Sequence, residues 1–74
     1  MNDTDILAEL ADILAAPDPI TPETPLEPPL TWDSMALLAY LAFLRFHFNT
    51  ILPGASCKDF RTVADLLAPT RPKP

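Results

Sequence analysis

Ten of the 74 residues are proline and only one is glycine. Six of the prolines fall at positions 17, 19, 22, 25, 28 and 29. Proline lacks the amide hydrogen that helix interiors and central strands need, so this segment is predicted to form neither. The scarcity of glycine argues against a β protein rich in tight turns. We therefore predict a long connection over residues 16–32, fastened to the core by Ile20, Leu26 and Leu30.

Apolar residues at helical spacing flank this connection on both sides. The first predicted helix covers residues 4–15, with Asp3 or Thr4 as its cap, and its inward positions are Ile6, Leu7, Leu10, Ile13 and Leu14. The second covers residues 34–48, capped by Asp33 or Thr31 and ended by Asn49. A short helix over 56–60 and a last helix over 62–68 follow. The chain is thus expected to be all-α, with one domain over 1–68 and a flexible tail over 69–74.

The second predicted helix is apolar around most of its circumference. One stripe is expected to face the core, made of Leu38, Leu41, Leu44 and Phe48, with Tyr40 at the core's edge and its hydroxyl in water. A three-helix domain cannot bury both sides of one helix by itself. The remaining face is therefore predicted to dock a partner through Met35, Ala39, Phe43 and Phe46. Two alternatives stay open, namely that the proline-rich loop covers this face or that the chain self-associates.

Charge and residue usage exclude several classes of protein. The net charge is −5, which disfavours a nucleic-acid partner because phosphate binding needs a basic surface. Cys57 is the only cysteine, so no internal disulfide can form, and a reduced, cytoplasmic setting is expected. The acidic first residues lack the basic region of a signal peptide, and the apolar run 35–44 is too short to span a bilayer. With one histidine, His47, and no ligand spacing, neither a catalytic triad nor a metal site is expected.

Ser34 is the candidate functional residue. It follows Asp33 and opens the second predicted helix, so its hydroxyl is expected to be exposed at a helix N-terminus. Backbone N–H groups and the helix dipole favour a phosphate at such a position. Without a neighbouring base, Ser34 would be displayed for attachment rather than activated for catalysis. The simpler interpretation is a serine that only caps the helix.

Three segments together resemble the acyl and peptidyl carrier protein family. Asp33-Ser34-Met35 is similar to the family's Asp-Ser-Leu motif, with methionine in place of leucine. Residues 48–53 resemble its Phe-Gly-Ile-x-Ile-Pro segment, with Asn49 where glycine is usual, and 62–67 resemble its closing threonine-valine helix. The resemblance covers residues 4–68. It implies a right-handed four-helix bundle with three main helices and one short one.

The same resemblance implies that Ser34 carries 4′-phosphopantetheine, transferred from coenzyme A by a phosphopantetheinyl transferase to which Asp33 helps present the serine. The chain would then not be an enzyme. It would carry an acyl or aminoacyl thioester between a loading ligase and a ketosynthase or condensation-type enzyme, in fatty acid, polyketide or nonribosomal peptide synthesis. The second helix departs from the family because it has no acidic side chain. The alternative function is an unmodified helical module that binds a protein through this apolar helix.

Overall fold

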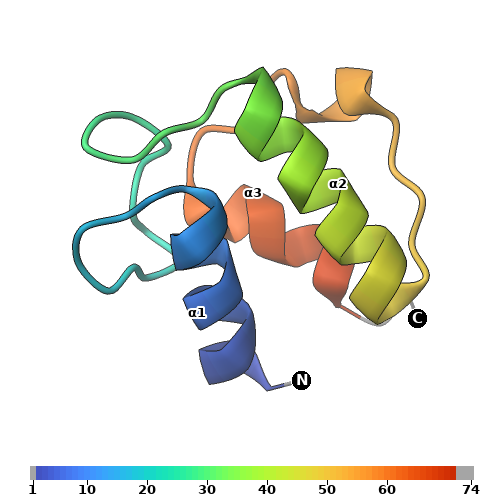
Figure 1. Cartoon of the computed structure of the whole chain (residues 1–74), viewed down its shortest axis with the longest axis horizontal. Helices are drawn as coiled ribbons and strands as arrows, with labels where there is room; N and C mark the ends of the chain where they lie inside the picture. The colour runs from blue at the N-terminus through green and yellow to red at the C-terminus, as the bar shows by residue number, and fades with distance from the viewer. Residues whose placement is uncertain (1, 72–74) are drawn as a thin grey trace.

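Three α-helices and two 3-10 turns make up the regular structure of residues 2–71. A computed structural model describes residues 2–71. The elements are α1 (Asp3–Ile13), α2 (Ser34–Phe48), η1 (Gly54–Cys57), α3 (Val63–Leu67) and η2 (Ala68–Thr70). No strand occurs within these residues, and a single isolated bridge pairs Pro25 with Thr62. The predicted helical class is therefore confirmed, with α3 lying between α1 and α2 in the view of Figure 1.

Local capping chemistry sets the helix ends. Asn2 caps α1, because its side-chain oxygen accepts a hydrogen bond from the Asp5 amide at 2.8 Å, so the predicted Asp3 or Thr4 cap is wrong. Asp33 caps α2 as predicted, accepting from the Ala36 amide at 2.9 Å. Asn49 ends α2 in the left-handed conformation, with φ of 50° and ψ of 36°, which also confirms the prediction.

The proline-rich connection is held by backbone hydrogen bonds to the start of α3. The amide of Leu26 donates to the carbonyl of Arg61 at 2.8 Å, and the amide of Val63 donates to Thr24 at 2.9 Å. Ile20 and Leu30 are buried and Leu26 is half-buried, as expected of inward anchors. These contacts place the connection against α3 and not over the exposed side of α2, so it does not cover that side.

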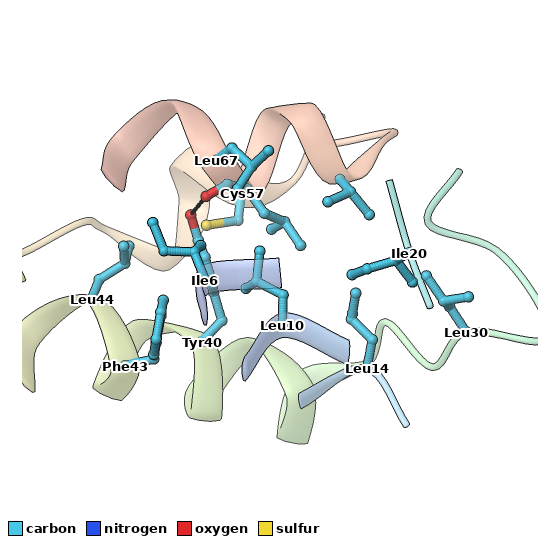
Figure 2. Packing of buried hydrophobic residues seen from close by; sticks show 12 residues of the cluster. Ile6, Leu10, Leu14, Ile20, Leu30, Tyr40, Phe43, Leu44, Cys57 and Leu67 are labelled. Carbon is cyan, nitrogen blue, oxygen red and sulfur yellow. Dashed lines mark hydrogen bonds between the residues drawn. The ribbon is translucent and has the colours of Figure 1, made fainter. Parts of the chain in front are cut away.

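The core brings side chains from all three helices and the connection together (Figure 2). Tyr40 is fully buried at its centre, and its hydroxyl donates to the carbonyl of Leu66 at 2.8 Å. The prediction that Tyr40 lies at the edge with a wet hydroxyl is therefore wrong. Leu66 supplies the acceptor that lets the phenol leave water, which satisfies the rule that buried hydroxyls are paired. The buried apolar residues are Ile6, Leu10, Leu14, Ile20, Leu30, Ala36, Tyr40, Phe43, Leu44, Cys57, Val63, Leu66 and Leu67.

The predicted core stripe of α2 has the wrong phase around the helix axis. Leu44 is buried, but Leu38 is 67% exposed and Leu41 and Phe48 are only half-buried. The observed buried face centres on Tyr40 instead. Because α2 is apolar nearly all round, its periodicity does not indicate which side turns inward.

The last described residues belong to the fold, so the predicted tail begins too early. Thr70 is buried and its hydroxyl donates to the Leu67 carbonyl at 2.6 Å. Arg71 forms an exposed ion pair with Asp3 at 2.6 Å, which ties the two ends of the chain together. The rest of the predicted tail, residues 72–74, lies outside the described residues. The predicted short helix over 56–60 is replaced by η1, three residues of which precede Cys57.

None of the helices in residues 2–71 has the length and apolar character that a membrane crossing requires. The radius of gyration is 11.2 Å, close to the value of about 11 Å that a compact domain of this length should have. The described residues thus form one packed unit that leaves the start of α2 accessible.

Candidate functional site

Ser34 is exposed as the first residue of α2. Its predecessor Asp33 makes the two contacts that start the helix. The Asp33 carboxylate accepts from the Ala36 amide at 2.9 Å, and its carbonyl accepts from the Leu37 amide at 2.9 Å. Asp33 therefore performs the capping that the simpler interpretation gave to Ser34. The serine hydroxyl is left available at the positive end of the helix dipole.

A shallow groove of about 310 Å³ runs beside Ser34, between the start of α2 and η1. Most of its wall is apolar, and Lys58 is the one cationic residue among those that line it. A groove of this kind suits an elongated group with an anionic end and an apolar stem. The lining residues are Trp32, Asp33, Ser34, Leu37, Gly54, Cys57 and Lys58.

Trp32 contributes both to the core and to the groove. Its ring packs edge-on against Tyr40, with 6.0 Å between ring centroids, and its side chain is half-buried. This contact packs Trp32 against the core. Trp32 also lines the groove beside Ser34.

Cys57 lies at the floor of the groove as a structural residue. It is only 2% exposed, and burial raises the pKa of its thiol. A raised pKa keeps the thiol protonated at neutral pH, which makes it a poor nucleophile. Cys57 is thus part of the hydrophobic core.

Within residues 2–71, no histidine lies beside Ser34 to act as a general base. His47 lies thirteen residues further along α2, which is roughly 20 Å at 1.5 Å per residue. Its ring contacts Phe43 and Phe46, with centroid distances of 5.0 and 5.4 Å. Among residues 2–71, no group of three or more His, Cys, Asp or Glu side chains is placed to hold a metal ion. The arrangement displays the Ser34 hydroxyl without activating it.

The predicted docking residues divide into two groups. Met35 is 76% exposed, Phe46 is 86% exposed, and Ala39 is exposed between them. Phe43 is only 6% exposed, so the prediction that it belongs to a docking face is wrong. Its ring packs edge-on against Phe48, with 5.6 Å between centroids, on the side of α2 that faces the core.

The structure adds Leu38 and Ala42 to the exposed apolar side of α2. Leu38 was missed because it was assigned to the predicted core stripe. The spacing of the five positions was visible in the sequence, since they recur at intervals of three and four as one helical face should. We call this surface the apolar stripe, and it consists of Met35, Leu38, Ala39, Ala42 and Phe46.

A larger open hollow of about 580 Å³ lies at the other end of α2. Neither a serine, a cysteine, a histidine nor a carboxylate lines it, so it offers no nucleophile or acid–base pair of the usual kinds. The residues around it are Phe48, Asn49, Thr50, Ile51, Pro69, Thr70 and Arg71. Ile51, one of these residues, is 79% exposed.

No protein-family model, curated protein or solved structure matches this chain. The function is therefore argued from the geometry at Ser34 and from the motif around it. That geometry defines a displayed hydroxyl at a helix start, beside an apolar groove with one cationic side chain.

Proposed function

We propose that the chain is a carrier domain that bears 4′-phosphopantetheine on Ser34. The observation that carries the proposal is the exposed Ser34 hydroxyl at the start of α2, directly after a residue that already caps the helix. A serine needed only for capping would occupy the position of Asp33. The resemblance of Asp33-Ser34-Met35 to the carrier-protein motif and the exposed position of Ser34 both favour the Ser34 hydroxyl oxygen as the attachment atom.

The residues around Ser34 suit the group that would be attached. The first turn of α2 favours the negative charge of a phosphodiester, worth about 0.3–1 kcal/mol to the modified form. Lys58, on the other wall of the groove, adds a second favourable charge. Trp32 and Leu37 provide apolar surface along which a pantetheine stem can lie. Once attached, the arm supplies a terminal thiol that holds a substrate as a thioester.

Attachment requires a separate transferase, because no histidine in the described part of the chain lies near Ser34 to take its proton. The Ser34 oxygen would form a bond to the pantetheine-bearing phosphorus of coenzyme A. The pyrophosphate bond breaks, adenosine 3′,5′-bisphosphate leaves, and the hydroxyl proton passes to a base on the transferase. Asp33, exposed beside Ser34, would help present the serine to the transferase and its magnesium ion. This role is compatible with capping, which uses only one carboxylate oxygen.

The proposal extends to architecture and partners. The family's right-handed four-helix bundle would place η1 where carriers have their short helix. A loading ligase and a ketosynthase or condensation-type enzyme would act on the arm, in a cytoplasmic setting. Met35, Ala39 and Phe46 lie on the helix that Ser34 opens, so these exposed residues would contact such enzymes. The chain would perform no catalysis of its own.

Intact-mass measurement tests the proposal. The chain is incubated with coenzyme A and a broad-specificity phosphopantetheinyl transferase, with a known carrier protein in a parallel reaction to show that the transferase is active. We expect a gain of one phosphopantetheine mass, which Ser34→Ala abolishes. Ser56 is the only other serine and is also exposed, so Ser56→Ala is the matched control and should retain the gain. An unchanged mass beside a modified control carrier would refute the proposal.

A second candidate function is an unmodified helical module that binds a protein. The exposed apolar stripe on α2 favours it, because this surface would suit a protein interface with or without an arm on Ser34. The same mass measurement separates the two functions. An unmodified Ser34 would leave the interaction module as the better explanation of the stripe.

A further inference from the structure

The apolar stripe runs along the whole exposed side of α2. Three of its five residues are large, and each is at least two-thirds exposed: Met35 at 76%, Leu38 at 67% and Phe46 at 86%. The proline-rich connection packs against α3 instead, so nothing within residues 2–71 covers the stripe. Exposed apolar surface that is continuous over several turns of one helix indicates an interface.

The sizes of the side chains along the stripe are self-complementary. Small residues, Ala39 and Ala42, lie at its middle, and large residues, Met35 and Phe46, lie at its ends. Two antiparallel copies centred between the alanines would place Ala39 opposite Ala42, which lets the helices approach closely. The same symmetry places Met35 opposite Phe46 at both ends, a favourable sulfur–aromatic pairing.

The charges beside the stripe favour the same arrangement. Arg45 is exposed and donates to the Asn49 side chain at 2.6 Å, and no carboxylate within residues 2–71 lies at ion-pair distance from it. Arg45 follows Ser34 by about three turns, so both lie along one edge of the stripe. Antiparallel pairing brings Arg45 of each copy near Asp33 and Ser34 of the other. Parallel two-fold pairing would instead place the two Arg45 side chains on opposite edges of the interface, and neither would lie near Asp33 or Ser34 of the other copy.

The area of the stripe sets the strength of the association. Exposed side chains of these sizes offer roughly 500 Å² per copy, so pairing would remove about 1,000 Å² from water. This is less than the ~1,600 Å² of a standard stable interface, and it falls in the range of weak, reversible complexes. Each chain already has its own buried core, so folding does not depend on pairing.

We propose that a second copy of this chain covers the apolar stripe, forming a weak antiparallel dimer through α2. The dimer is two-fold symmetric, with its axis between Ala39 and Ala42. It leaves Ser34 of each copy at the edge of the interface, next to Arg45 of the other. An enzyme that docks on the stripe would displace the second copy. The dimer does not depend on Ser34 being modified.

Sedimentation of the unmodified full chain over low-micromolar to millimolar concentrations tests the dimer. We expect the average mass to rise from the 8.1 kDa of one chain toward that of two. Phe46→Ser and Ala39→Glu should each weaken association about tenfold or more. Ile51→Ser is the matched control, since Ile51 is 79% exposed but lies outside the stripe, and it should change nothing. All substituted positions are exposed, and circular dichroism checks that each variant keeps its helices.

Mixed disulfides test the orientation. An equimolar mixture of Met35→Cys and Phe46→Cys chains should form the mixed disulfide faster than either chain pairs with itself, while native Cys57 stays buried. A preference for like pairs would overturn the antiparallel arrangement. A chain that stays monomeric at millimolar concentration, or equal effects of Phe46→Ser and Ile51→Ser, would overturn the dimer and leave the stripe to a different protein. Because Ser34 modification is measured separately by mass, either proposal can fail alone.

Discussion

The two faces of α2 are similar in composition and opposite in environment. One face carries Ala36, Tyr40, Phe43 and Leu44, which are all buried. The other is the apolar stripe, whose three large side chains are mostly in water. Hydrophobicity therefore does not explain which face became the core. The comparison shows that an apolar helix in a small domain can supply a core and an interface at once.

The hydroxyl of Tyr40 is the feature that distinguishes the buried face. It is the most polar group on that face, yet it is fully buried because the Leu66 carbonyl accepts its hydrogen bond. Phe60 and Trp32 pack edge-on against the same ring, with centroid distances of 6.4 and 6.0 Å. A specific polar contact from α3, together with these aromatic contacts, orients α2. The stripe has no such partner within the described chain.

Truncation of one phenylalanine on each face gives the largest expected contrast. Phe43→Ala should lower the free energy of unfolding by about 3–5 kcal/mol, because it removes a buried ring and leaves a cavity. Phe46→Ala, at an 86% exposed position, should change it by less than about 0.5 kcal/mol. Urea unfolding of dilute protein, followed by circular dichroism, measures both. Equal losses would mean that the two faces are not distinct.

Removal of the Tyr40 hydroxyl should have an intermediate effect. Tyr40→Phe keeps the ring but leaves the Leu66 carbonyl without this donor, which should cost about 1–3 kcal/mol. Denaturant unfolding at neutral pH measures the loss. A stability equal to that of the natural chain would show that the hydroxyl does not orient α2.

The Tyr40→Phe variant also tests how ionisation of Tyr40 affects stability at high pH. Burial, and secondarily the nearby Cys57, raises the pKa of Tyr40 above its ordinary value of about 10. The folded state therefore keeps the phenol proton that the unfolded chain releases, so this group's contribution to stability is lost as pH rises above about 10. The stability advantage of the natural chain over Tyr40→Phe should shrink across that range. An advantage that stays constant through pH 10 and above would contradict the raised pKa.

Substitution of Asp33 is expected to have the smallest effect on stability. It tests the N-terminus of α2, where the buried face and the apolar stripe both begin. Asp33→Ala should lower stability by about 1 kcal/mol, because the Ala36 amide loses its side-chain acceptor. Asp33→Asn keeps an acceptor oxygen and should keep most of that stability. If the carboxylate also presents Ser34, Asp33→Asn should slow phosphopantetheine transfer while the melting temperature stays nearly unchanged. If the Asp33→Asn variant and the natural chain accept phosphopantetheine at equal rates, Asp33 has the capping role alone.

Features that depend on neighbours in the sequence were predictable. The Asp33 cap and the Asn49 stop each follow from one residue's backbone chemistry, and the structure confirms them. The cap of α1 was missed by one position, since Asn2, Asp3 and Thr4 all have the chemistry of a cap. The exposure of Ser34 was predictable because it follows directly from where α2 begins.

Features that depend on distant residues were not predictable. Phe43 and Phe46 have the same side chain on the same helix, and only the packing of α1 and α3 buries one and exposes the other. Likewise, Arg71 was predicted to belong to a flexible tail, but its side chain pairs with Asp3, 68 residues away in the sequence.

The sequence by itself determined where α2 of this protein begins and ends, and that Ser34 opens it. Backbone dihedral limits and capping hydrogen bonds act over three or four residues, so they are written locally in the chain. Only the tertiary structure decided which side of α2 faces inward. An almost uniformly apolar helix has no side that its own sequence directs toward the core. The side that carries Tyr40 faces inward because the Leu66 carbonyl, twenty-six residues further along the chain, accepts the hydrogen bond of the Tyr40 hydroxyl there.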